Sequence, residues 1–216
     1  MSPPAGEERV NNPRFARMYL RTSAKRKSDR EEANRRELLA GLSGAVIEVG
    51  AGNGLNFPFY PATVERVVAV EPEPTMRTAA VEAAVPSPVA IEVVDGVASR
   101  LPADDESFDA GVASLMLCSV PDQARALAEF HRVIRPGGEL RFYEHVVARN
   151  RVGVGLQRFA DATLWPRLLG GCHLSRDTAG AIASAGFVIE RIERFSFSPD
   201  PPVPPLPHIL GIARRR

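Results

Sequence analysis

The sequence contains little that would place the protein outside the reducing interior of a cell. It has two cysteines, Cys118 and Cys172, among 216 residues. We therefore expect no disulfide framework, and we expect a cytoplasmic location. It has no apolar run of about 18 residues, the length that spans a membrane. Prolines and glutamates lie within the first eight positions, where a signal peptide would need an apolar core. No membrane anchor is therefore expected.

An excess of charge of one sign is also missing. The formal net charge is +1, and 25% of the residues are charged. A near-neutral chain lacks the basic footprint of nucleic-acid-binding proteins, and the closing run Arg214-Arg215-Arg216 is better interpreted as a solvated tail. We therefore expect a small-molecule partner and no nucleic acid. Nothing in the sequence indicates an oligomeric state.

Apolar runs that alternate with helix-forming segments organise the chain. With 44% hydrophobic residues, the chain suits one α/β domain with an ample core. Strands that alternate with helices predict a parallel sheet, and two final strands without a helix between them predict an antiparallel hairpin at its edge. The expected strands cover 45–49, 66–70, 89–94, 108–113, 139–147, 187–197 and 207–213, and the expected helices cover 13–21, 28–42, 74–84, 123–134, 153–169 and 176–185.

These elements predict a Rossmann-like, doubly wound α/β fold. The sheet has seven strands, is mostly parallel with an antiparallel C-terminal hairpin strand, and carries helices on both faces. Residues 1–43 are expected to form an N-terminal segment whose helices cover the active site, and residues 44–216 the main domain. We see no internal repeat and no second domain.

A glycine loop after the first expected strand is the most informative local pattern. The run from Val46 to Val49 opens into Gly50-Ala51-Gly52-Asn53-Gly54, and Glu71 ends the next apolar run 21 positions after Gly50. In doubly wound sheets, such a loop lets the backbone approach a ligand, and the distant acid accepts hydrogen bonds from ribose hydroxyls. The loop and Glu71 together therefore predict a site for an adenosyl ligand.

Two absences in this loop narrow the ligand. Leu55 stands where the sequence motif of dinucleotide-binding proteins has its third glycine. The helix is therefore not expected to pack closely behind a pyrophosphate, which argues against a dinucleotide ligand. No Lys-Ser/Thr pair follows the glycines, which excludes the Walker phosphate loop. S-adenosylmethionine has a ribose, an adenine and an amino-acid tail but no phosphate, and it fits what remains.

Four sequence blocks carry a resemblance to a known family. The blocks read E-V-G-A-G-N-G at 48–54, V-V-A-V-E-P at 67–72, L-P-A-D-D-E-S-F-D at 101–109 and R-V-I-R-P-G-G at 132–138. With them, the chain resembles the class I S-adenosylmethionine-dependent methyltransferases of the type 11 group over nearly all of residues 40–213. The segments 56–61, 117–120, 142–146, 171–174 and 207–209 are similar to those of the alkyl thiol S-methyltransferases. Those proteins carry an N-terminal hydrophobic anchor, and the resemblance of this chain does not include that anchor.

The resemblance implies a set of cofactor-binding residues. Gly50, Ala51 and Gly52 approach the amino-acid tail, Glu48 supports the loop from below, and Glu71 takes the ribose. Met76 either lies against the adenine or belongs to the core. Ser114 and Leu115, after the fourth strand, flank the tail and the sulfonium. The full expected set is Glu48, Gly50, Ala51, Gly52, Asn56, Glu71, Pro72, Met76, Val97, Ala98, Ser114 and Leu115.

The adenine block departs from the family pattern. Where the family has a carboxylate that accepts from the adenine amino group, this chain has Val97, within Gly96 to Pro102. Backbone groups of Val97 and Ala98, or a shifted Asp95, are the alternatives that remain for this contact.

The expected reaction is an in-line displacement that depends mainly on position. A thiol with a pKa near ~8.5 needs only modest help to react as a thiolate. Two residues at the end of the fifth strand, Glu144 and His145, are candidates for helping to deprotonate the thiol. As alternatives, Glu144 forms hydrogen bonds to the backbone, and His145 is a structural residue. Asp161 completes the expected catalytic set.

The remaining polar and aromatic residues suggest an acceptor pocket. A Cys172-His173 pair without further ligands at metal-binding spacing predicts no metal site, and Cys118 is expected to be a small buried residue. Aromatic side chains indicate a small lipophilic acceptor, an alkyl thiol by resemblance. The alternatives are an O-, N- or C-methyltransferase of secondary metabolism or quinone biosynthesis, and a non-catalytic cofactor-binding module. The expected pocket residues are Tyr19, Phe59, Tyr143, Trp165 and His173.

Overall fold

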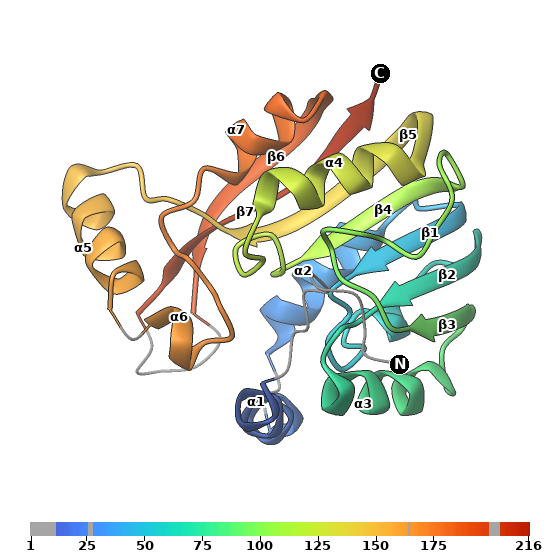
Figure 1. Ribbon diagram of the computed structural model, residues 1–216, viewed down its shortest axis with the longest axis horizontal. Helices are drawn as coiled ribbons and strands as arrows, with labels where there is room; N and C mark the ends of the chain where they lie inside the picture. The colour runs from blue at the N-terminus through green and yellow to red at the C-terminus, as the bar shows by residue number, and fades with distance from the viewer. Residues whose placement is uncertain (1–11, 26–27, 164, 199–203) are drawn as a thin grey trace, which may run out of the picture.

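A computed structural model describes residues 12–25, 28–163, 165–198 and 204–216 (Figure 1). Parts of the expected N-terminal segment, 1–11 and 26–27, therefore lie outside the described residues. The helices are α1 Pro13–Lys25, α2 Asp29–Leu39, η1 Phe57–Phe59 (a 3₁₀ turn), α3 Pro74–Ala84, α4 Gln123–Val133, α5 Arg151–Asp161, α6 Trp165–Leu168 and α7 Thr178–Ser184. The strands are β1 Gly44–Val49, β2 Val64–Val70, β3 Ala90–Val94, β4 Phe108–Ser114, β5 Ile134–His145, β6 Phe187–Phe197 and β7 Leu206–Arg215.

The strands form one seven-stranded sheet in the order β3-β2-β1-β4-β5-β7-β6. Neighbours from β3 to β5 run parallel, and β7 runs antiparallel to both β5 and β6. The predicted sheet is confirmed, with the final strand inserted between β5 and β6. The order reverses between β1 and β4, and ligands of doubly wound sheets bind beyond the carboxyl ends of the strands at that point.

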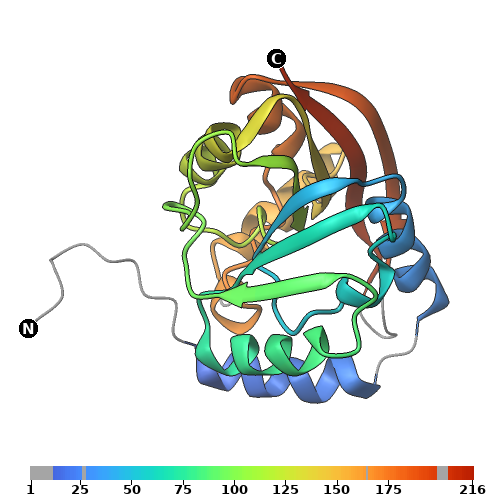
Figure 2. The ribbon, with the colours of Figure 1, turned by 90° about the vertical axis from the view of Figure 1, so that its right-hand side faces the viewer.

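Helices cover both faces of the sheet (Figures 1 and 2). On one face, α4 and α7 pack over a core that includes Ile47, Phe130 and Phe142, all fully buried. On the other face, α2, α3 and η1 enclose a second core that includes Leu38 and Phe57. Because β1 lies between both cores, its last five residues are all buried, which explains its continuous apolar run.

Local signals set most helix ends, and one prediction is corrected. Ser28 caps α2 by accepting a hydrogen bond from the Glu31 amide, as expected of a capping box. The single helix expected over 153–169 is instead two helices, α5 and α6. Pro166 is the physical reason: within one continuous helix it has no N–H to donate and its ring clashes with the preceding turn.

The expected fifth strand also differs from the structure at its start. The strand is expected to begin at Glu139, but β5 begins at Ile134 and includes Pro136. Its register to β4 is irregular in this first part. The proline lies before the regular pairing of β4 with β5, which resumes at Glu139.

Helix α1 lies beside the carboxyl edge of the sheet, close to the glycine loop. The Asn53 side chain donates to Ser23 Oγ over 3.2 Å, and a Cβ added to Gly170 would lie 2.6 Å from the Phe15 ring. Thus α1 contacts both the loop after β1 and the turn after α6. Helix α2, by contrast, packs on the sheet next to β5 and β7.

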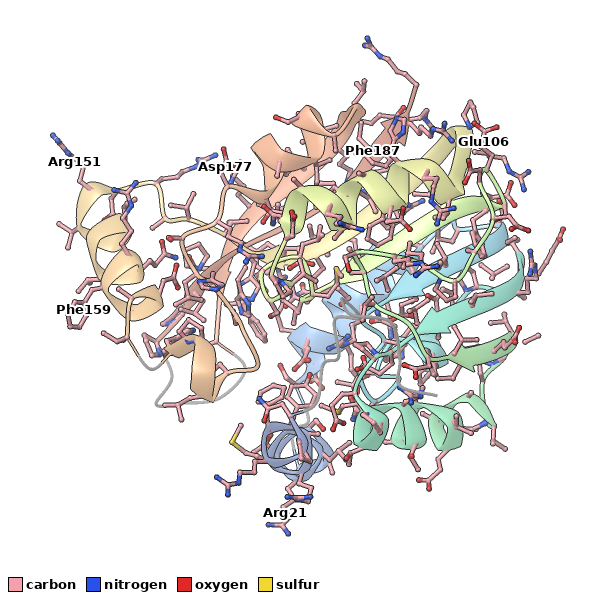
Figure 3. All side chains as sticks on the ribbon, viewed as in Figure 1. Arg21, Glu106, Arg151, Phe159, Asp177 and Phe187 are labelled. Carbon is pink, nitrogen blue, oxygen red and sulfur yellow. The ribbon has the colours of Figure 1, made fainter. Side chains whose placement is uncertain are left out.

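Helix α5 projects from the body of the protein. Its side chains Val152, Leu156 and Phe159 are exposed, and Figure 3 shows Phe159 and Arg151 pointing away from the sheet. Among the described residues, none of the helices combines the length and apolar character needed to cross a membrane.

Candidate functional site

The glycine loop leaves β1 at the carboxyl edge of the sheet. Gly50 and Gly52 have φ of +70° and +59°, a backbone region that glycine adopts without a Cβ penalty. A Cβ at Gly50 would lie 2.8 Å from Met116, so the loop packs tightly against the segment after β4. Around Gly52, by contrast, the described residues leave 4 Å of open space at the Cβ position. The backbone at Gly52 is therefore open to a ligand. Ala51 is buried between them.

Glu71 directly follows β2 and turns its carboxylate toward the glycine loop. One oxygen accepts from the Gly52 amide at 2.7 Å and the other from the Glu73 amide at 2.9 Å. Burial raises its pKa to about 7, which outweighs the two amide hydrogen bonds. Pro72 follows it. The expected ribose acceptor therefore lies beside the loop, with its carboxylate held by backbone.

Glu48 lies under the loop in a buried polar network. Its carboxylate accepts from Asn56 Nδ2 at 2.8 Å and from the Tyr60 hydroxyl at 2.6 Å. The Asn56 carbonyl oxygen accepts from Arg35 of α2 at 2.7 Å. Burial raises the pKa of Glu48, and these donors oppose it. Both Glu48 and Asn56 are thus engaged in hydrogen bonds beneath the loop.

The expected adenine side lies next to β3. Met76 is 5% exposed in the first turn of α3, and Val97 and Ala98 are half-buried in the turn after β3. Asp95, one of the alternatives for the missing carboxylate, is paired with Arg77 at 3.0 Å. The Val97 carbonyl accepts from the Arg100 amide at 3.1 Å, so the backbone alternative for the adenine contact rests on the remaining backbone groups of Val97 and Ala98.

Ser114 is the last residue of β4, and Leu115 follows it. The buried Ser114 Oγ has no hydrogen-bond partner among the described residues, so it can take a polar group of a ligand. Leu115 has φ of +57°, a conformation that costs about 1 kcal/mol or more for a residue with a Cβ, and its amide donates to the Tyr143 carbonyl. Backbone strain of this kind concentrates at ligand sites. Together with Glu71 and open Gly52, this orphaned hydroxyl fits the ribose and amino-acid tail of S-adenosylmethionine.

Glu144, in β5, is fully buried behind the segment after β4. Its carboxylate accepts from the amides of Met116, Leu117 and Cys118 at 2.9 to 3.0 Å. Burial raises its pKa, against the effect of these three amides. The arrangement favours the alternative in which Glu144 holds the backbone.

Asp161, at the end of α5, has a similar arrangement. Its carboxylate accepts from the amides of Leu174 and Ser175 and from the Ser175 hydroxyl, at 2.6 to 2.9 Å. It therefore ties α5 to the turn that leads into α7. A role as a proton acceptor would require it to give up one of these bonds.

His145 has two sulfur neighbours that the sequence did not suggest. Its Nδ1 lies 3.6 Å from both Cys118 Sγ and Cys172 Sγ, and the two sulfurs are 3.7 Å apart. The hydrogen bond with Cys172 and burial raise the pKa of Cys118 to about 12. The backbone of His173 lies next to this group, because its amide donates to the Cys118 carbonyl at 2.8 Å.

The expected pocket aromatics are only partly brought together. Tyr143 is buried on the α2 face, where its hydroxyl accepts from Asn34 and its ring stacks near Phe195 and His208. Trp165 packs with Cys118 and Cys172, and its buried indole N–H has no partner among the described residues.

Tyr19 and Phe59 lie in different elements and contact different residues. Tyr19 lies on α1 beside Phe15, with ring centroids 5.8 Å apart. Phe59 lies in η1, under the Arg36 guanidinium at 4.5 Å. The structure therefore groups Trp165 with the sulfur cluster and places Phe59 elsewhere.

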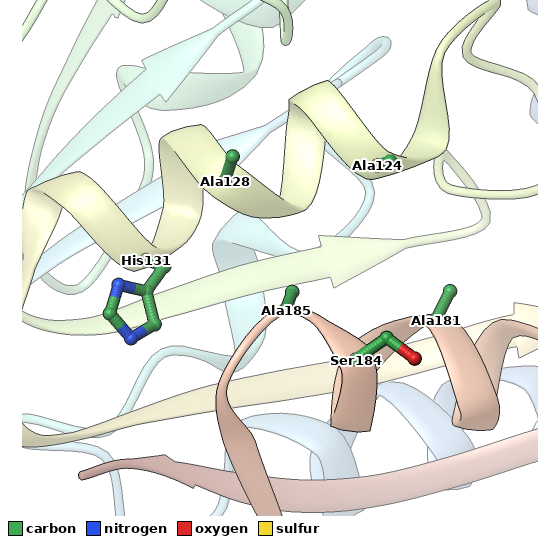
Figure 4. A pocket seen from close by; sticks show the side chains of 6 residues that line it. All are labelled: Ala124, Ala128, His131, Ala181, Ser184 and Ala185. Carbon is green, nitrogen blue, oxygen red and sulfur yellow. The ribbon is translucent and has the colours of Figure 1, made fainter.

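A groove of about 360 Å³ lies between α4 and α7 (Figure 4). Small side chains on facing helix surfaces leave this gap, and its lining residues come from these two helices and from Ala185 at the end of α7, away from the loops that follow the parallel strands. The residues are Ala124, Ala128, His131, Ala181, Ser184 and Ala185.

Comparisons with known proteins agree with the geometry. Residues 47–142 match the family model of the methyltransferase domain. The chain is 34% identical over 205 residues to the thiol S-methyltransferase TMT1B of Mus musculus, covering 92% of this chain and 81% of that protein. It is 35% identical over 180 residues to the human (Homo sapiens) thiol S-methyltransferase TMT1A, covering 81% and 72%.

A solved structure shows the same fold. The geranyl diphosphate C-methyltransferase of Streptomyces coelicolor, in complex with S-adenosyl-L-homocysteine, matches with a TM-score of 0.65 at 14% identity, over 87% of this chain and 80% of that one. From the family match, the relatives and this fold, we conclude that the chain belongs to the class I S-adenosylmethionine-dependent methyltransferases, in the type 11 group, and is an enzyme that uses S-adenosylmethionine.

Proposed function

We propose that the enzyme methylates a small lipophilic thiol at the edge where β1, β4 and β5 end. The observation that carries the proposal is the extent of similarity to thiol S-methyltransferases. The match with the mouse relative spans 205 residues and so includes the segments after β5, where this fold builds the acceptor side, as well as the cofactor loop.

In this proposal, the chain holds the cofactor mainly through four contacts. Glu71 accepts from the ribose, the open backbone at Gly52 and the orphaned Ser114 hydroxyl receive the amino-acid tail, and the backbone at Val97 and Ala98 meets the adenine. Helix α1 covers the bound molecule through its contacts to the loop and to Gly170. The cofactor supplies a methyl group on a sulfonium, which leaves a neutral thioether when the acceptor lone pair takes the carbon.

Methylation of a thiol would need little help from a basic side chain of the protein. Glu144 and Asp161 each accept three hydrogen bonds that hold backbone or a neighbouring side chain in place, so we assign them positioning roles. A thiol with a pKa of about 8.5 is already partly ionised near neutral pH. Trp165 and the Cys118–Cys172 neighbourhood would provide the apolar wall against which a lipophilic thiol lies.

A label-transfer panel tests this function. The full chain is incubated with methyl-labelled S-adenosylmethionine and matched sets of alkyl thiols, phenols and amines. We expect transfer to alkyl thiols, and a large loss in Glu71→Ala. Turnover of phenols or amines without thiols would contradict the thiol assignment, and cofactor binding without any methylated acceptor would contradict turnover itself.

A further inference from the structure

Three soft metal-binding side chains meet near the carboxyl ends of β4 and β5. Cys118 follows β4, His145 ends β5, and Cys172 follows α6. Their ligand atoms all lie within 4.8 Å of one another, and both cysteines are buried while His145 is partly exposed. In the part of the chain that the structure describes, this group contains three ligands.

The distances match those of a tetrahedral zinc site. With Zn–S bonds of about 2.3 Å and Zn–N bonds of about 2.0 Å at tetrahedral angles, two sulfurs lie about 3.8 Å apart and each lies about 3.5 Å from the nitrogen. Here the two sulfurs are 3.7 Å apart, and each is 3.6 Å from His145 Nδ1. A disulfide would need sulfurs about 2.05 Å apart, so the group is spaced for a shared cation.

Contacts with the surrounding backbone and side chains fix the positions of these ligand residues. Glu144 accepts from the Cys118 amide at 3.0 Å and so fixes the first sulfur. Gly171, with φ of +90°, lets the turn before Cys172 approach the Ser119 carbonyl, where a Cβ would lie 2.7 Å from the oxygen. Supporting contacts that orient ligands are typical of metal sites.

We propose that Cys118, His145 and Cys172 bind Zn²⁺ and leave the fourth tetrahedral position to the acceptor thiol. Three protein ligands with one open position are typical of zinc sites that bind a substrate, whereas structural sites are closed by a fourth protein ligand. Two cysteines with one histidine select zinc among the common divalent cations. The acceptor part of this proposal rests on the proposed thiol function; the metal part does not.

The open position would activate the acceptor at the point where it is needed. A thiol that binds Zn²⁺ does so as the thiolate and gives its proton to solvent, which produces the nucleophile without a protein base. The site also lies close to the cofactor loop, because Met116, two residues before Cys118, packs against Gly50. This arrangement would explain why Glu144 and Asp161 are free to serve as positioning residues.

Cobalt spectroscopy of the full chain tests metal binding without any turnover. Reduced, metal-free protein is titrated with Co²⁺, and zinc content is measured separately after dialysis against Zn²⁺. We expect one equivalent of Co²⁺ with thiolate-to-metal charge-transfer absorption and the visible bands of tetrahedral Co²⁺. Cys118→Ser and Cys172→Ser should each weaken Zn²⁺ binding by more than about 100-fold. His131→Ala, on α4 beside the groove to α7 and outside the group, is the matched control and should bind as the wild type does.

The same cobalt-loaded protein tests the open position. Addition of benzyl mercaptan should shift and strengthen the charge-transfer absorption, while benzyl alcohol should leave it unchanged. Circular dichroism confirms that the serine variants are folded; if either is not, chelation and reloading of the wild type provides the same comparison.

The outcomes separate the two proposals. No stoichiometric metal uptake under reducing conditions, or uptake that persists in both serine variants, overturns the metal site. Uptake without any response to the thiol overturns the open position. Thiol methylation by protein that contains no metal and is insensitive to chelators overturns the activating role while the proposed function stands.

Discussion

Glu71 combines a ligand-facing position with an altered acidity. Burial raises its pKa to about 7, so in the free protein it is largely protonated below that pH and ionised above it. A carboxylate accepts from two ribose hydroxyls, whereas the protonated form loses acceptor capacity. If the ionised form binds, affinity for the cofactor should fall by up to about tenfold for each pH unit below 7 and level off above it. Titration calorimetry between pH 5.5 and 8.5 measures this.

The control for this pH dependence is Glu71→Gln. It keeps the shape but cannot ionise, so its affinity should vary less with pH than that of the wild type. Any titration of the ligand itself affects both proteins equally. A wild-type profile that is parallel to that of the variant would mean that Glu71 does not contact the ribose as a carboxylate.

Glu144 gives a second prediction at the scale of one residue. Glu144→Ala would leave three buried amides without an acceptor, and each such loss costs about 1–3 kcal/mol. We expect a fall in the free energy of unfolding of more than about 3 kcal/mol, which corresponds to a decrease in Tm of more than about 6 °C for a chain of this size. Differential scanning calorimetry measures it. A stable Ala variant that had lost only turnover would instead support a catalytic base.

The two sites differ in how far the sequence predicts them. The glycine loop and Glu71 lie 21 positions apart within one strand-loop-strand unit, so local spacing predicts both. Cys118, His145 and Cys172 are each separated by 27 residues and come from three different segments. They meet only because β4 and β5 are neighbours and the turn after α6 folds back over them. Sequence spacing does not predict that residues from three distant segments come together. The sequence instead draws attention to the adjacent residues Cys172 and His173 as a pair.

At the scale of elements, α1 should contribute to cofactor affinity if it covers the bound molecule. Phe15 packs on Gly170, so Phe15→Ala should remove about 1–2 kcal/mol of docking energy and raise the Kd for the cofactor about 5- to 30-fold. Met18 lies on the same helix but is 44% exposed, and Met18→Ala is the matched control. Calorimetry that found equal affinity in both variants would remove α1 from the binding site.

Strand β7 places a glycine where a side chain of β5 and the backbone of β6 come close together. A Cβ at Gly211 would lie 2.5 Å from the Phe142 ring of β5 and closer still to the Arg191 carbonyl of β6. Gly211→Ala should therefore cost about 2–3 kcal/mol and lower Tm by about 4–12 °C. Gly155→Ala in exposed α5, with open space around it among the described residues, should instead stabilise by about 0.5–1 kcal/mol. Thermal unfolding of both variants measures the contrast.

Most elements could be predicted because their signals are local, and the exceptions have physical causes. Ser28 caps α2 and the buried runs form β1 and β2, as their patterns indicate. The helical pattern across 153–169 continues through Pro166, but backbone sterics end the helix before it. Periodicity alone does not report such a break.

At the scale of the molecule, the glycine loop and the proposed acceptor side meet through one segment. The backbone from Ser114 to Cys118 contacts Gly50 through Met116, carries the strained Leu115, and ends at the sulfur group. Glu144 fixes this segment from β5. Binding at one end should therefore order the backbone that forms the other, which joins the two halves of the sheet into one site.

The thermal stability of the whole protein should report cofactor binding, because a ligand that binds only the folded state stabilises it. At a concentration 100 times the Kd, this linkage contributes about 2.7 kcal/mol, or about 5–10 °C in Tm for a chain of this size. S-adenosylhomocysteine should produce a shift of similar size, since it keeps the ribose and the amino-acid tail. Glu71→Ala removes a charged acceptor worth about 1.5–3 kcal/mol and should weaken binding roughly 10- to 150-fold, so about half to nine tenths of the shift at the same concentration should disappear. A full shift in that variant would show that the acid after β2 does not hold the cofactor.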